Sequence, residues 1–92
     1  MDVYAQIAVK IIEQQESIIG PVAIEQAKRV SGLKVDWGKK EVSISGNESS
    51  IIDKLVDQYK ELFGQISVEV CKEAASSLVS QLPAGGTPQA LK

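Results

Sequence analysis

A change of apolar face between Ile51 and Leu82 constrains the fold of this chain more than any other sequence feature. From Ile51 to Ile66 the apolar residues recur every three or four positions and lie within roughly 140° of arc around a helix axis. After Ser67 the pattern re-forms on the opposite side of a straight helix. The segment is therefore either one helix with two apolar faces or two helices that meet near Gly64, and the pattern leaves both alternatives open.

The N-terminal segment predicts a helix that is covered by more than one neighbour. Asp2 can cap this helix, and its apolar residues extend over about half of the circumference. Gln14 and Gln15 interrupt the apolar stripe. A glutamine buried at such a position would fix the register of packing more than it would add stability.

A second, short helix is predicted from about Pro21 to Val30. Gly20-Pro21 separates it from the first helix, because proline fits the first helical turn, where its missing N–H is not needed. Gly32 follows where a C-terminal cap requires a left-handed residue. The two helices therefore form a helical hairpin.

From residue 33 the apolar period changes to two, which predicts two strands joined at Gly38-Lys39-Lys40. The predicted fold is α+β: a helical hairpin, a two-stranded antiparallel β-hairpin, and one long or two consecutive C-terminal helices. Residues 1–82 make a single small domain. Residues 83–92 are rich in small and turn-forming residues without periodicity, so we expect a flexible C-terminal tail.

Composition argues against several classes of function. The chain has no histidine, which removes histidine-based triads and nearly all histidine-containing metal sites. Its single cysteine, Cys71, allows no internal disulfide, and a net charge of −2 does not favour non-specific binding to nucleic acid or membranes. The first residues lack the basic region and cleavage site of a signal peptide. We therefore expect a cytoplasmic, non-enzymatic protein without metal, cofactor or membrane contact.

Self-association is indicated by the wide apolar face of the first helix, by the face switch and by the free edges of the β-hairpin. We predict a homodimer that serves as an interaction module, an adaptor or regulatory subunit of a larger cytoplasmic protein or complex. The predicted interface combines the apolar positions of the first and last helices: Ile7, Ile11, Ile18, Val68, Cys71, Ala75, Leu78 and Leu82.

Two charged groups are candidates for docking a larger partner. One is an acidic row on the polar face of the long helix, and the other is the basic tip of the β-hairpin. Carboxylates one turn apart on a single helix do not converge on a metal ion, so the row suits a basic protein surface instead. A basic tip also suits a winged-helix-like nucleic-acid binder, and a third alternative is a carrier of a small apolar ligand. The candidates are Asp53, Asp57 and Glu61 in the row, and Lys34, Lys39 and Lys40 at the tip.

Overall fold

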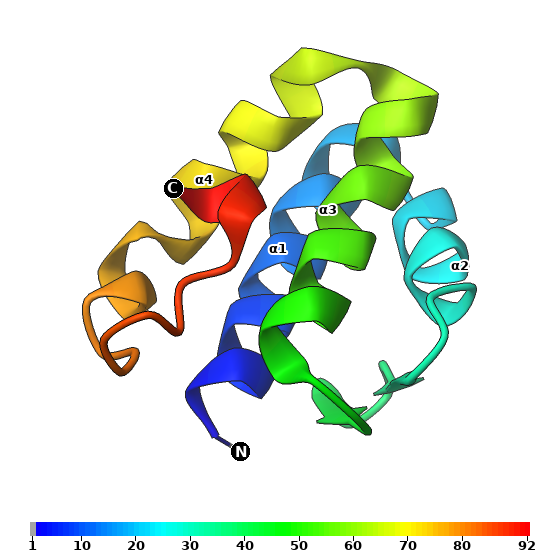
Figure 1. Cartoon of the computed structure of the whole chain (residues 1–92). Helices are drawn as coiled ribbons and strands as arrows, with labels where there is room; N and C mark the ends of the chain where they lie inside the picture. The colour runs from blue at the N-terminus through cyan, green and yellow to red at the C-terminus, as the bar shows by residue number, and fades with distance from the viewer. Residues whose placement is uncertain (1) are drawn as a thin grey trace.

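The computed structural model describes residues 2–92 and has the predicted α+β architecture. Two helices precede the β-hairpin and two follow it. The segment from Ile51 to Leu82 therefore contains two helices and not one long helix. Figure 1 shows α1 between α4 and α2, with α3 packed across it. In chain order the elements are α1 (Val3–Ile19), α2 (Val22–Lys28), β1 (Leu33–Asp36), β2 (Glu41–Ile44), α3 (Glu48–Phe63), α4 (Gln65–Val79) and the 3-10 helix η1 (Gln89–Leu91).

The helix α1 is the central element of the fold. It contacts α2, α3, α4 and β2, all within the same chain. Ile7, Ile11 and Ile12 have no solvent-exposed surface. Asp2 caps the helix as predicted, since its Oδ1 accepts a hydrogen bond of 2.8 Å from the Ala5 N–H. The wide apolar arc of α1 therefore reflects a central position in one chain.

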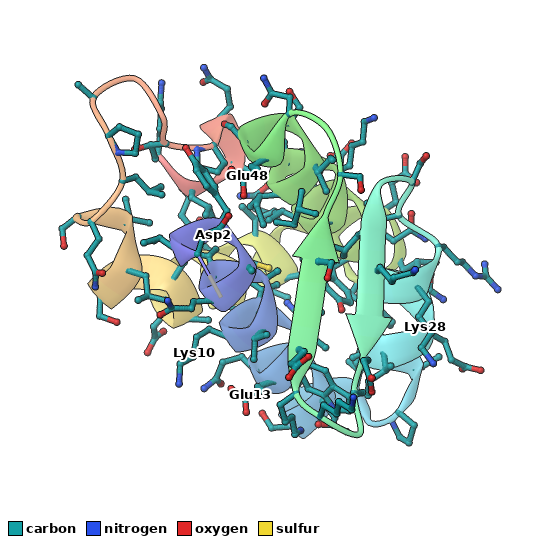
Figure 2. All side chains as sticks on the ribbon, turned by 90° about the horizontal axis from the view of Figure 1, so that it is seen from below. Asp2, Lys10, Glu13, Lys28 and Glu48 are labelled. Atoms are coloured by element: carbon teal, nitrogen blue, oxygen red, sulfur yellow. The ribbon has the colours of Figure 1, made fainter. Side chains whose placement is uncertain are left out.

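The β-hairpin covers the side of α1 and α2 that α3 and α4 leave open. The strands pair antiparallel, with Leu33 opposite Ile44 and Val35 opposite Val42. The strand β2 lies against α1 and β1 lies against α2 (Figure 2). This placement buries Leu33 and Val42 and gives the hairpin the support that two isolated strands lack.

The change of apolar face is explained by a reversal of the chain at Gly64. This glycine has a φ of 82°, and its N–H donates to the Lys60 carbonyl to end α3. The next helix begins at once and runs back alongside α1 in the opposite direction (Figure 1). Because the direction reverses, Leu55 of α3 and Cys71 of α4 both face the same core.

Six of the eight residues predicted for the dimer interface belong to this core, and their assignment to an interface is corrected here. Each is at most 9% exposed within one chain. Helical periodicity shows that a face is covered, but it does not distinguish cover by the same chain from cover by a partner. Ile18 is exposed and Leu82 is half-buried. The six core residues are Ile7, Ile11, Val68, Cys71, Ala75 and Leu78.

Residues 83–92, expected from composition to be a flexible tail, lie against α3 and α4. The Tyr4 hydroxyl donates a hydrogen bond of 2.7 Å to the Gly86 carbonyl. The Asp53 carboxylate accepts from the backbone N–H groups of Gln89 at 3.2 Å and Ala90 at 2.8 Å. Leu91 is 8% exposed. These contacts join residues far apart in sequence, so local composition does not indicate them.

We expect Asp53→Ala to release η1 from α3, because it removes the acceptor for both backbone N–H groups. Amide hydrogen exchange at Gln89 and Ala90 should accelerate about tenfold, the effect of losing roughly 1.4 kcal/mol of local stability. Asp57→Ala, an exposed site one turn further along α3, is the control and should leave exchange unchanged. Equal exchange in both variants would show that Asp53 does not hold this segment.

Two carboxyl groups meet where α1 and α3 begin. Asp2 and Glu48 lie next to each other in Figure 2, where a proton on one carboxyl can form a hydrogen bond to the other. This bond from Glu48, followed by the N–H of Ala5, holds the pKa of Asp2 below its ordinary value of 3.8. The same bond raises the pKa of Glu48 above 4.5. Glu48 is therefore the member of the pair that carries the shared proton.

Glu48→Gln is expected to raise the melting temperature at neutral pH. A raised folded-state pKa means that the contribution of Glu48 is present below its unfolded pKa and is lost as pH rises through the folded value. The amide donates to Asp2 without needing a proton, so the advantage of the variant should disappear once the pH falls below 4.5. Asp2→Asn should give a smaller gain at neutral pH, because its amide can donate to Glu48 and its Oδ1 still caps Ala5, but the negative charge at the start of α1 is lost. Thermal unfolding across this pH range checks both, and a lower melting temperature for Glu48→Gln would contradict the assignment.

Candidate protein-binding surface

The acidic row predicted on α3 does not act as one unit. Asp53 is half-buried and holds the backbone of η1, as described above. Asp57 and Glu61 are exposed to solvent. Only these two carboxylates remain free to meet a basic surface.

The basic hairpin tip is fastened to α1 through Lys40. Its Nζ lies 3.7 Å from Glu16 Oε1 and 4.0 Å from the centroid of the Trp37 ring. Trp37 Nε1 donates to the same Glu16 oxygen at 3.2 Å. Lys34 and Lys39 stay exposed, and neither makes an ion pair within residues 2–92. The tip thus keeps two of its three predicted lysines for a partner.

Large apolar side chains are exposed at one end of the molecule. Among the described residues they are Ile18 at 60%, Leu62 at 51%, Phe63 at 38% and Ile66 at 73%. They come from the last turns of α1 and α3 and the first turn of α4, which lie at the same end in Figure 1. Single exposed apolar residues are ordinary, but four at the same end of the molecule indicate contact with another molecule. We call these four residues the apolar end surface.

A groove between α1 and α4 continues this surface. It has a volume of about 390 Å³. Ile18 of the apolar end surface is also one of the residues that line the groove, so the groove meets the surface at this residue. Its lining combines apolar and polar side chains: Gln14 and Ile18 from α1, and Val70, Glu73 and Ala74 from α4.

The relative position of α1 and α4 is fixed by Gln15, which is 1% exposed. Its Nε2 donates to the Ser67 carbonyl at 3.2 Å and to Cys71 Sγ at 3.4 Å. This confirms that a glutamine of the interrupted stripe is buried, while Gln14 beside it is exposed. Burial raises the pKa of the Cys71 thiol to about 11 against the opposing hydrogen bond from Gln15, so the thiol is protonated and unreactive at neutral pH.

Most residues of the apolar end surface are exposed although their helical spacing predicts burial. Leu62, Phe63 and Ile66 share the apolar stripe of Leu55, and helical spacing alone predicts that they face the core with it. They are exposed because the last turn of α3 and the first turn of α4 lie at the end of the molecule, beyond the other elements that residues 2–92 form (Figure 1). The apolar period does not indicate where a helix extends beyond the elements that pack against it. Of the four residues, the sequence therefore identifies only Ile18 as a contact candidate.

Within residues 2–92, no three His, Cys, Asp or Glu side chains come together in a way that could hold a metal ion. No described helix is both long and apolar enough to cross a membrane. No protein-family model matches the chain, and none of the curated proteins or solved structures compared with it is a match. The function is therefore inferred from the geometry of the described residues.

Proposed function

We propose that this protein is a non-enzymatic interaction module, an adaptor or regulatory subunit that binds another protein through the apolar end surface. The observation that carries the proposal is the grouping of Ile18, Leu62, Phe63 and Ile66 beside a groove. Their exposed parts amount to on the order of 400 Å² of apolar area. Removing that area from water would contribute about 10 kcal/mol before the entropic costs of association.

The chemistry of the surface favours a protein over the two alternatives. Glu73 is the one charged residue that lines the groove, and a carboxylate repels the phosphates of nucleic acid. At the hairpin tip only Lys34 and Lys39 remain unpaired. Two lysines are a small group for binding the phosphates of nucleic acid. A carrier of a small apolar ligand needs a pocket that encloses most of the ligand, whereas Ile18 in this groove is 60% exposed.

A cytoplasmic location is part of the proposal. The single cysteine is free and buried, in keeping with a compartment that keeps thiols reduced. A reduced thiol also leaves Gln15 its partner at Cys71 Sγ, on which the position of α4 depends.

The proposal is tested by affinity capture with quantitative mass spectrometry, using a lysate of the cells from which the gene comes. Ile66→Glu should deplete the proteins captured by the wild type by at least about tenfold, because it places an unpaired charge in the contact. Ser50→Glu adds the same charge at the opposite end of α3 and should capture as the wild type does. Equal capture by Ile66→Glu and the wild type would exclude the apolar end surface.

The basic tip is tested in the same experiment by the double variant Lys34→Glu/Lys39→Glu. We expect its captured proteins to match those of the wild type. If capture instead depends on these lysines and falls steeply with salt, the tip is the contact and the nucleic-acid alternative gains support. Lys40 is left unchanged, because Glu16 and Trp37 give it a structural role.

A further inference from the structure

We propose that the apolar end surface and its groove bind a second copy of this chain, related by a two-fold axis that passes near Val70 of α4. The inference rests on the proposed function, because it names the partner of the same surface. A two-fold interface brings one patch of surface against itself, so the patch must be complementary to its own rotated image. Two features of the surface, its size and the order of its side-chain sizes, meet this requirement, and a third, the placement of charge, does not prevent it.

The first feature is the size of the surface. A standard protein interface buries about 800 Å² on each partner, of which somewhat more than half is apolar. The four exposed side chains of the apolar end surface supply on the order of 400 Å² of apolar area. This amount matches one folded partner of ordinary interface size, whereas a small ligand would leave much of it in water.

The second feature is the order of side-chain size along α4. Ile66, Val70 and Ala74 follow at intervals of four residues and form one ridge of the helix. Ile66 projects into solvent with 73% exposure, while Ala74 lies in the groove. A two-fold axis at Val70 reverses this order in the partner. Each Ile66 then faces the other copy's Ala74, so a large side chain meets a small one at both ends of the contact.

The third feature is the placement of charge. Lys72 compensates Glu69 on the same helix at 3.9 Å, which leaves Glu73 as the free carboxylate beside the ridge. Glu73 lies three residues from Val70, so the two-fold axis places the two copies of Glu73 on opposite sides of the centre. They are then separated by roughly 9 Å along the helices, and because Glu73 is an exposed residue, the repulsion between the two solvated carboxylates is weak.

Sedimentation equilibrium of the full chain, from about 1 μM to about 1 mM, is the first test. The wild type should dimerise within this range, and Ile66→Glu should weaken dimerisation at least about 100-fold, because two uncompensated charges enter each dimer. Ser50→Glu should dimerise like the wild type. Circular dichroism establishes that each variant is folded, and Ile66→Ser replaces Ile66→Glu if that variant is not.

Mixing two variants tests the geometry itself. Ala74→Lys alone should also be monomeric, since two ammonium groups then face two isoleucines. An equimolar mixture of Ile66→Glu and Ala74→Lys should form a 1:1 heterodimer, because the introduced carboxylate faces the introduced ammonium and the native pair remains at the other end. Native mass spectrometry detects this heterodimer directly.

A wild type that stays monomeric to about 1 mM would overturn the second copy as partner, and the capture experiment would still decide the proposed function. A dimer that persists in Ile66→Glu would overturn the apolar end surface as the dimer contact, and the capture experiment would still decide the proposed function. A mixture that remains monomeric while the wild type dimerises would overturn the two-fold axis at Val70.

Discussion

Gln15→Glu is expected to destabilise the protein by about 3–4 kcal/mol at pH 7. The side chain is 1% exposed and faces the Ser67 carbonyl and Cys71 Sγ. A carboxylate there cannot donate a hydrogen bond and loses its hydration, so the folded protein would keep the new carboxyl protonated. Holding that proton at pH 7 against an unfolded pKa of about 4.3 is the source of the cost.

The loss of stability in Gln15→Glu should increase as the pH rises. The new group has a folded pKa above its unfolded value, so the stability it contributes is present below the unfolded pKa and is lost as pH rises through the folded value. The difference between variant and wild type should therefore nearly vanish at about pH 4. Urea unfolding at pH 7 and at about pH 4 measures this difference in the free energy of unfolding. Gln14→Glu, on the exposed neighbour, is the matched control and should change stability by less than about 0.5 kcal/mol. A Gln15→Glu variant as stable as the control at pH 7 would contradict the burial of Gln15 against α4.

Gly32→Ala is expected to cost about 3 kcal/mol, the second large effect. The residue has a φ of +87°, which disfavours any side chain. A Cβ would also lie 2.7 Å from Ile51 Cδ1 and 2.8 Å from the Ser45 carbonyl oxygen. The Ile51 side chain can rotate away from the new Cβ. The Ser45 oxygen belongs to the backbone, so it can move only if the end of β2 moves with it.

Gly38→Ala is the control for this substitution, since it makes the same chemical change in the β-hairpin turn. The nearest atom to its Cβ is Asp36 Oδ1 at 3.7 Å, an ordinary contact, and its φ is not in the left-handed region. Its stability should stay within about 1 kcal/mol of the wild type, and a small gain is expected from the stiffer unfolded chain. Chemical unfolding of Gly32→Ala and Gly38→Ala under the same conditions compares their free energies of unfolding. Equal stabilities would show that β2 does not approach Gly32 as closely as described.

The order of elements was predictable from sequence because its signals are local. Asp2 has the chemistry of an N-cap, and Gly20, Gly32 and Gly64 stand where the backbone needs a positive φ. The change of period at residue 33 separates the strands from the helices. These features act over a few residues, so one sequence is enough to read them.

The cover of each apolar face was not predictable, because it depends on how distant elements are placed. Ile11 and Ala75 have the spacing of an interface seam, and their own chain covers them. Ile66 has the spacing of a core residue and lies in solvent. The Tyr4–Gly86 hydrogen bond joins positions 82 apart in sequence, which no local pattern reports. The sequence therefore predicts only one residue of the candidate surface, Ile18, as a contact residue.

The central position of α1 has a consequence for how the chain is synthesised. The helix emerges from the ribosome before α3 and α4, yet these two cover much of its apolar face. Until they follow, the part of the apolar face of α1 that α3 and α4 cover stays open to water and to other nascent chains. The native contacts that close the core are long-range, so they form late and after a search slower than that of a local helical bundle. A ribosome that stalls before α4 would thus release a chain with a strong tendency to aggregate.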